Sequence, residues 1–143
     1  MEKVTVEVEL SEEFIGDVLV TAFDKNYGAC NYWAGVDKVY LSEANEIGMS
    51  QADRKWTKVE ITDIVKAQGN ILEGEDFQEE SQYTIDAGTV AEGLRQIVLE
   101  KDNYPFAYVY TTIACTQGNA GEIDAPLADM IVQLGLWGEV KYG

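Results

Sequence analysis

Histidine is absent from this chain of 143 residues, and cysteine and proline each occur only twice. Without histidine the chain lacks the commonest general base and the commonest metal ligand, which excludes Ser-His-Asp and Cys-His catalysis. Cys30 and Cys115 lie far apart with no Cys-x-x-Cys motif, so they support no zinc site. We interpret both as small buried residues of a protein from a reducing compartment.

Positive charge is also scarce. Ten Lys and Arg residues face 26 Asp and Glu residues, a formal net charge of 10 − 26 = −16. Such a chain repels phosphate backbones, which argues against direct binding of DNA or RNA. Residues 1–72 carry 7 basic and 13 acidic side chains (7 − 13 = −6), whereas residues 73–143 carry 3 and 13 (3 − 13 = −10). We therefore expect the C-terminal half to present the more anionic surface.

Membrane and catalytic signatures are missing as well. No apolar run approaches the roughly 20 residues that cross a bilayer, and the start has no apolar signal core, so we expect a cytoplasmic protein with no membrane contact. The motifs GxxxxGK[ST], GxGxxG, HExxH and GxSxG do not occur. We therefore predict that the protein is not an enzyme and uses no cofactor and no metal.

The residues that are present suit a single globular domain over residues 1–143, because 46% of them are hydrophobic. Alternation of apolar and polar residues predicts a half-buried strand at 3–10. Aromatic and β-branched residues predict further strands, and the tail is a candidate edge strand. These segments are 32–41, 55–64, 71–72, 83–85 and 139–143.

Helical periodicity and capping residues predict about four helices. Their limits are 12–23 after Ser11, 87–101 after Asp86, 105–116 before Gly118, and a last helix from the Asp124 cap to Gly135. Asp129 is expected on the solvent side of that last helix, and residues 42–53 form a loop or a short helix. The order of elements predicts an α+β fold, a mostly antiparallel sheet with about four helices packed on one face.

A run of acidic residues is the first candidate for a binding surface. This acidic segment consists of Glu73, Glu75, Asp76, Glu79 and Glu80. Three interpretations are open: a solvated, mobile loop; a mimic of nucleic-acid phosphates that occupies a basic protein groove; or a weak Ca²⁺ or Mg²⁺ site, although the spacing matches no known metal loop. Only the second interpretation makes the segment a surface that binds a protein partner.

Basic residues gather around one tryptophan in the sequence RKWTK. Such a group can stack a base and hold a phosphate, but it also suits a strand with an exposed amphipathic face. With a second tryptophan, it defines the alternative ligand-binding set for a small nucleotide. The residues are Trp33, Arg54, Lys55, Trp56 and Lys58.

The C-terminal sequence DAPLADMIVQLGLWGEVKYG resembles the ending of small acidic proteins of tailed phages and prophages, as do the opening VTVEVELSEEFIGDVLVTAFD and the segment NYWAG. In that group the chain closes roughly as D-x-I-V-Q-x-x-L-[FW]-G-E-[VI]-x-Y-G. The matching residues are Asp129, Ile131, Val132, Gln133, Leu136, Trp137, Gly138, Glu139, Val140, Tyr142 and Gly143. The resemblance implies action by binding, since such proteins often counter host defences, and it assigns no site residue.

Our leading hypothesis is a non-enzymatic phage or prophage protein in the host cytoplasm, which inhibits a host defence component through an acidic surface that meets a basic host protein. The first alternative is an oligomeric sponge that sequesters a nucleotide immune signal. The second is a structural or accessory phage protein that self-assembles through aromatic residues. A homo-oligomer is compatible with all three.

Overall fold

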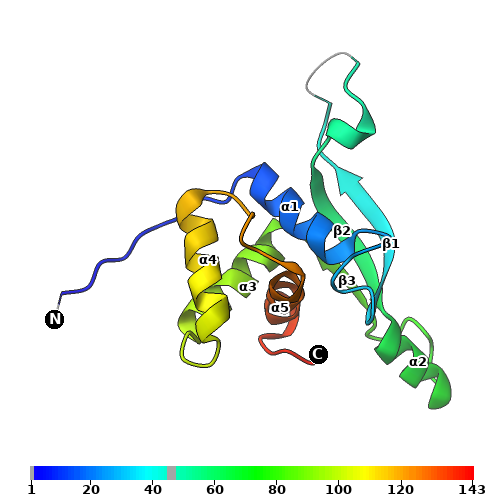
Figure 1. Cartoon of the computed structure of the whole chain (residues 1–143). Coiled ribbons are helices and arrows are strands. Elements are labelled where there is room, and N and C mark those ends of the chain that lie inside the picture. The colour runs from blue at the N-terminus through cyan, green and yellow to red at the C-terminus, as the bar shows by residue number, and fades with distance from the viewer. Residues whose placement is uncertain (1, 45–47) are drawn as a thin grey trace.

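Within residues 2–44 and 48–143, which the computed structural model describes, the chain forms five α-helices, one short 3-10 helix and three strands (Figure 1). The predicted α+β class is confirmed, with one α-helix more than the expected four. In chain order the elements are α1 (Glu12–Phe23), β1 (Ala34–Leu41), η1 (Gln51–Asp53), β2 (Trp56–Asp63), α2 (Ile64–Leu72), β3 (Gln82–Ile85), α3 (Ala87–Leu99), α4 (Pro105–Gln117) and α5 (Ala125–Trp137).

The strands form one antiparallel sheet in the order β1-β2-β3. Ala34 pairs with Asp63 at one end of the β1–β2 ladder, and Leu41 pairs with Trp56 at the other. The strands predicted at 32–41, 55–64 and 83–85 are confirmed within two residues at each end. The hydrophobic pattern predicts these three strands correctly because each of them has a neighbour in the sheet.

Side-chain caps set the starts of three helices as predicted. The Ser11 hydroxyl accepts from Phe14 N (3.0 Å), the Asp86 carboxylate from Thr89 N (3.1 Å), and the Asp124 carboxylate from Leu127 N (3.0 Å). Two left-handed glycines end helices: Gly118 (φ 72°) ends α4 as expected, whereas α5 continues beyond Gly135 and ends at Gly138 (φ 70°).

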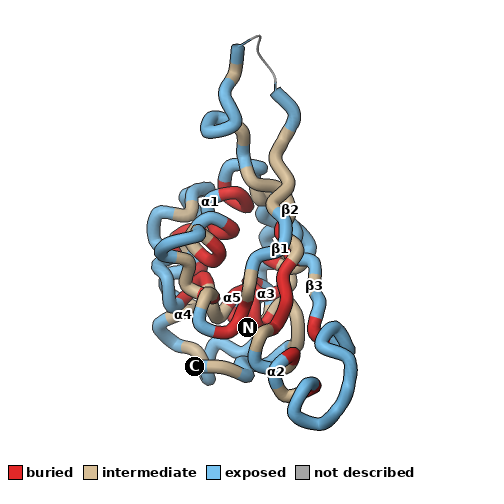
Figure 2. The backbone as a smooth tube through the Cα atoms, turned by 90° about the vertical axis from the view of Figure 1, so that its right-hand side faces the viewer, coloured by how far each residue is buried: buried red, intermediate tan, exposed pale blue. Residues whose placement is uncertain are grey.

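The helices α1, α3 and α5 cover one face of the sheet. α1 packs on β2, α5 packs against both α1 and α3, and α4 lies on the outer side of α3 (Figure 1). Figure 2 shows the buried residues gathered between these helices and the sheet. The largest fully buried apolar side chains there are Trp33, Phe14, Phe23, Leu19, Ile61, Ile85, Ile97 and Ile131. α2 is the exception, because it projects from the end of the sheet instead of covering its face.

The short strand predicted at 71–72 is wrong, since Ile71 and Leu72 form the last turn of α2. The helix begins where Asp63 closes β2: its Oδ1 accepts from Val65 N (3.1 Å) and Lys66 N (3.0 Å). A local cap thus prevails over the β propensity of the isoleucine and valine residues that follow it.

The strands predicted at both ends of the chain are also wrong. The described residues of 3–10 are extended but pair with no strand, and residues 139–143 form none either. The tail is held by a glutamine side chain instead of a neighbouring strand, because Gln133 Oε1 accepts from Lys141 N and Tyr142 N, each at 2.8 Å. Alternating side chains predict an extended backbone, but they do not specify a partner for it.

The connection at 42–53 contains η1, which agrees with the short-helix alternative, and its residues 45–47 lie outside the described residues. A search of the described helices finds none with the length and apolar character that crossing a membrane requires.

Candidate functional site

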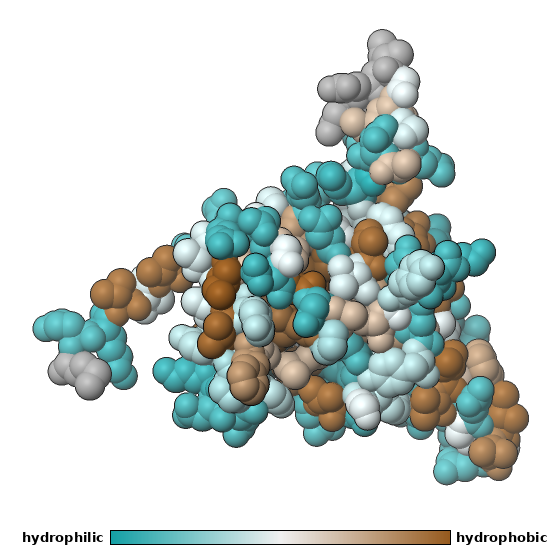
Figure 3. Space-filling view, viewed as in Figure 1, coloured by the Kyte–Doolittle hydropathy of each residue, from teal (hydrophilic) through white to brown (hydrophobic). Residues whose placement is uncertain are grey.

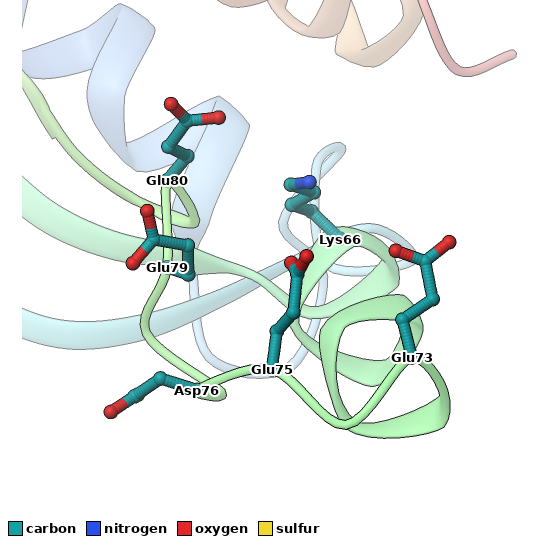
Figure 4. A pocket seen from close by; sticks show the side chains of 6 residues that line it. All are labelled: Lys66, Glu73, Glu75, Asp76, Glu79 and Glu80. Carbon is teal, nitrogen blue, oxygen red and sulfur yellow. The ribbon is translucent and has the colours of Figure 1, made fainter.

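The acidic segment lies in the connection between α2 and β3, which projects from the body of the molecule. We call residues 64–81 the acidic lobe. All five carboxylates of the segment are exposed, and together with Lys66 they line an open hollow of about 530 Å³ (Figure 4). The lining therefore carries five negative charges and one positive charge.

The backbone of this connection is held from inside by Asn70, which is 1% exposed. Its side-chain Nδ2 donates to Glu79 O (2.7 Å) and Phe77 O (3.4 Å), and the backbone carbonyl oxygen of Asn70 accepts from Glu75 N (2.7 Å). The Ser81 hydroxyl donates to Phe77 O at 2.8 Å. These bonds fix the conformation from which the carboxylates extend, which argues against the mobile-loop interpretation.

The carboxylates themselves are electrostatically uncompensated. Among the described residues, none of the five has a cationic nitrogen within 4.0 Å, the limit for an ion pair. Figure 4 shows them spread around the rim of the hollow, with Asp76 directed away from it, instead of converging on one point. Among the residues that the structure describes, no group of three acidic, cysteine or histidine side chains is arranged to hold a metal ion.

Large apolar side chains are exposed on the same lobe. Leu72 is 88% exposed and Phe77 is 43% exposed, and Val65 and Ile71 are exposed beside them. In Figure 3 these hydrophobic residues gather over the projecting end of the molecule next to hydrophilic ones. The sequence analysis missed this combination of apolar and acidic residues because it placed Ile71 and Leu72 in a strand.

The alternative ligand-binding set is divided between the two ends of the β1–β2 hairpin. Trp33 immediately precedes the Ala34–Asp63 pair, and Trp56 lies at the other end, opposite Leu41. Eight residue steps along a strand separate the two ends by about 25 Å. The structure therefore does not bring Trp33 together with the basic residues into one pocket, which leaves Trp56 as the tryptophan beside them.

Two of the three basic residues near Trp56 already contact other groups of the protein. Arg54 Nε donates to the Ser42 carbonyl oxygen, and Lys58 Nζ lies 4.2 Å from the centre of the Tyr40 ring. Of the three cationic residues in the set, only Lys55 is exposed. Trp56 is half-buried beside α1, so this end of the hairpin is a packed strand and not an open ligand pocket.

Trp33 belongs to the core. Its side chain is fully buried, with its ring 5.2 Å from that of Trp137 and 5.6 Å from that of Tyr142, measured between centres. Its Nε1 donates to Asp129 Oδ1 at 2.9 Å. No face of this indole is free to stack on a ligand.

Asp129, which the sequence predicts on the solvent side of the last helix, is the centre of a polar network. Its carboxylate accepts from Trp33 Nε1, from the Tyr32 hydroxyl (2.5 Å) and from Gln133 Nε2 (2.8 Å), and the Cys30 thiol lies at 3.5 Å. The solvent-facing prediction is wrong because these donors come from positions remote in sequence. No local signal on the helix could have identified them.

The same network controls the protonation of its members. Burial and the neighbouring Asp129 charge raise the pKa of Tyr32 from 10.0 to about 12 and raise the pKa of the Cys30 thiol far above its usual range. Burial and the hydrogen bond to Asp63 raise the pKa of Tyr142. A thiol that stays protonated is a poor nucleophile, so the network stabilises the fold and the C-terminal tail and does not activate a catalytic group.

Comparison of the chain with protein-family models, with curated proteins and with solved structures finds no match in any of the three. Function is therefore inferred from the acidic lobe and its chemistry.

Proposed function

We propose that this protein is a non-enzymatic binding protein of phage or prophage origin, which inhibits a host defence component by presenting its acidic lobe to a basic protein surface. The observation that carries the proposal is the set of five carboxylates, which have no cationic partner among the described residues, on a backbone held by Asn70. Such a surface can receive Lys and Arg side chains without first breaking ion pairs or ordering a loop.

The exposed Leu72 and Phe77 side chains support binding of a protein over simple solvation. A surface that serves only to keep a chain in solution has no use for a large apolar residue among its charges. Protein interfaces, in contrast, commonly surround apolar anchors with a charged rim. The acidic rim would occupy the place of nucleic-acid phosphates in the groove of the partner.

The origin and the host target in this proposal derive from the resemblance of the C-terminal sequence to phage proteins. The lack of catalytic motifs supports action by binding. Competition follows directly from phosphate mimicry: the protein and a nucleic acid would exclude each other from the same basic groove.

Affinity capture from bacterial lysate, followed by mass spectrometry, tests the proposal when it is done with matched variants. The lobe variant combines Glu75→Gln and Glu79→Gln, and it leaves Asp76 intact because Asp76 Oδ1 accepts from Gln78 N within the turn. The control variant combines Asp102→Asn and Glu122→Gln, two exposed acids outside the lobe. We expect a nucleic-acid-binding protein to be captured by the wild type and the control but not by the lobe variant.

Inhibition of defence has its own test. We expect expression of the wild-type protein to restore phage plating on a bacterial strain whose defence protein it captures, whereas the lobe variant leaves plating low. Capture of the same partner by all three proteins, or plating that the lobe variant restores equally well, would remove the acidic lobe from the account.

A further inference from the structure

The N-terminal arm, residues 2–10, combines an exposed backbone with an apolar face. Val4 is 87% exposed and Val6 is 74% exposed, and they alternate with Thr5, Glu7 and Glu9. The arm leaves the body beside α4 and projects away from it (Figures 1 and 3). Three valines on one face of an unpaired extended segment are the pattern of a strand that binds to another surface.

A groove at the base of the arm is lined mainly by apolar side chains, like the valine face of the arm. The arm, α3 and α4 border an open groove of about 760 Å³, and the valine face of the arm forms one of its walls. The opposite walls include Leu94, Val98, Tyr108 and Cys115. The groove is open, so the apolar segment of a second chain can enter it in place of the chain's own arm.

The charge distribution favours a second copy of this chain as the occupant of the groove. Residues 103–121 contain no charged side chain, although the chain as a whole carries −16. Among the described residues that line the groove there is no carboxylate, and the charged side chain there is Arg95, which pairs with Glu92. Two copies of so acidic a chain repel each other over most of their surface, and a groove whose described lining has no carboxylate is a place where they can meet.

We propose that two copies of this chain form a symmetric dimer in which the arm of each copy lies in the groove of the other, with Val4, Val6 and Val8 against α3 and α4. The arm lies on the same side of the molecule as α3 and α4, which border the groove (Figure 1). A single two-fold axis can therefore make both contacts at once. An arm of nine residues spans about 30 Å when extended, which exceeds the roughly 20 Å length of α4.

Sedimentation analysis of the full chain tests the proposal with three variants that make the same change, Val→Asp, at exposed sites. Val6→Asp alters the arm, and Val98→Asp alters the groove wall, where the side chain is 46% exposed. Val109→Asp is the control, because Val109 is 50% exposed on α4 but does not border the groove. We expect the wild type and Val109→Asp to be dimers, and the other two to dissociate at least about tenfold more readily.

Mixing two variants shows whether arms are exchanged. Copies with Val4→Cys are mixed with copies with Thr112→Cys, both carrying Cys115→Ser, and treated with a short bismaleimide. A cross-link between the two kinds of copy supports the proposal. The proposal is overturned by a monomer at concentrations up to about 100 μM, by a dimer that Val6→Asp and Val98→Asp leave intact, or by the absence of any cross-link between the two kinds of copy. Circular dichroism confirms that each variant is folded.

Discussion

Asp129 shows how much a single residue contributes to this fold. Its carboxylate accepts from Trp33, Tyr32 and Gln133, so it joins the start of β1, α5 and, through Gln133, the C-terminal tail. From the sequence, the Asp124 cap could be predicted because its partner is three residues away. The role of Asp129 could not, because Trp33 lies 96 positions away and only the folded chain brings it near.

We expect Asp129→Ala to lower the free energy of unfolding by about 3 kcal/mol, because it leaves the buried donor Trp33 Nε1 without an acceptor and removes one of the acceptors of Gln133 Nε2. Urea unfolding followed by tryptophan fluorescence measures the change. The exposed Asp102→Asn serves as the control and should stay within about 0.5 kcal/mol of the wild type. Equal stability of Asp129→Ala and the control would show that the network contributes nothing.

The raised pKa of Tyr32 predicts a loss of stability in alkali. The folded protein holds the phenol protonated up to a pKa of about 12, whereas the ordinary value is 10.0. The folded state therefore binds the proton more tightly, and this contribution is complete below pH 10 and lost as the pH rises through 12. Tyr142, whose pKa is also raised, acts in the same direction.

We expect Tyr32→Phe to be less stable than the wild type near neutral pH and to lose less further stability between pH 10 and pH 12. Unfolding curves across this range provide the measurement, and the exposed Tyr27→Phe is the control. Parallel stability curves for Tyr32→Phe and the wild type would contradict the assignment of the raised pKa to Tyr32.

At the scale of elements, the contact between α3 and α5 depends on two glycines. A side chain at Gly93 would collide with the Ile131 carbonyl, and one at Gly135 would collide with the Thr89 carbonyl. The sequence analysis assigned Gly135 to the end of a helix, because glycine commonly has that role. Its actual role is a close helix crossing, which requires knowledge of the neighbouring helix.

We expect Gly93→Ala to destabilise the protein by about 3 kcal/mol, since the backbones of α3 and α5 must separate to admit a methyl group. Gly69→Ala in α2 is the matched control, because nothing lies within 4 Å of its added Cβ. There the substitution should stabilise the helix by about 0.5–1 kcal/mol. Thermal unfolding of both variants tests the crossing, and equal effects would refute it.

The conformation of the acidic lobe depends on the hydrogen bonds of one buried residue, Asn70. We expect Asn70→Ala to release the backbone of residues 75–81, because Glu79 and Phe77 lose their amide donor. Hydrogen exchange of these amides should accelerate while that of α3 and α5 does not. Unchanged exchange in the lobe would mean that the loop holds its shape without Asn70.

The success of prediction from sequence differed by element for a physical reason. Strands inside the sheet and the helices capped by Ser11, Asp86 and Asp124 were found because their signals are local and agree with their packing. Residues 3–10 have an equally clear pattern, yet they pair with no strand within the described chain. The pattern indicates an apolar face, and it cannot indicate whether the surface that covers this face belongs to the same molecule.

For the whole molecule, the charge of −16 has two separate consequences. The acidic lobe concentrates uncompensated carboxylates at one end, and the uncharged residues 103–121 border the groove beside the arm (Figure 1). Salt should affect the two surfaces in opposite directions. It weakens attraction between the lobe and a basic partner, and it strengthens contact between two like-charged copies.

The most direct test of the account measures the affinity of the wild type and of the Glu75→Gln/Glu79→Gln variant for the captured partner at low and high salt. We predict that wild-type binding weakens steeply with salt, that the variant binds weakly with a shallower salt dependence, and that the Asp102→Asn/Glu122→Gln control follows the wild type. Affinity that is unchanged by salt, or equal in the wild type and the lobe variant, would contradict binding through the acidic lobe.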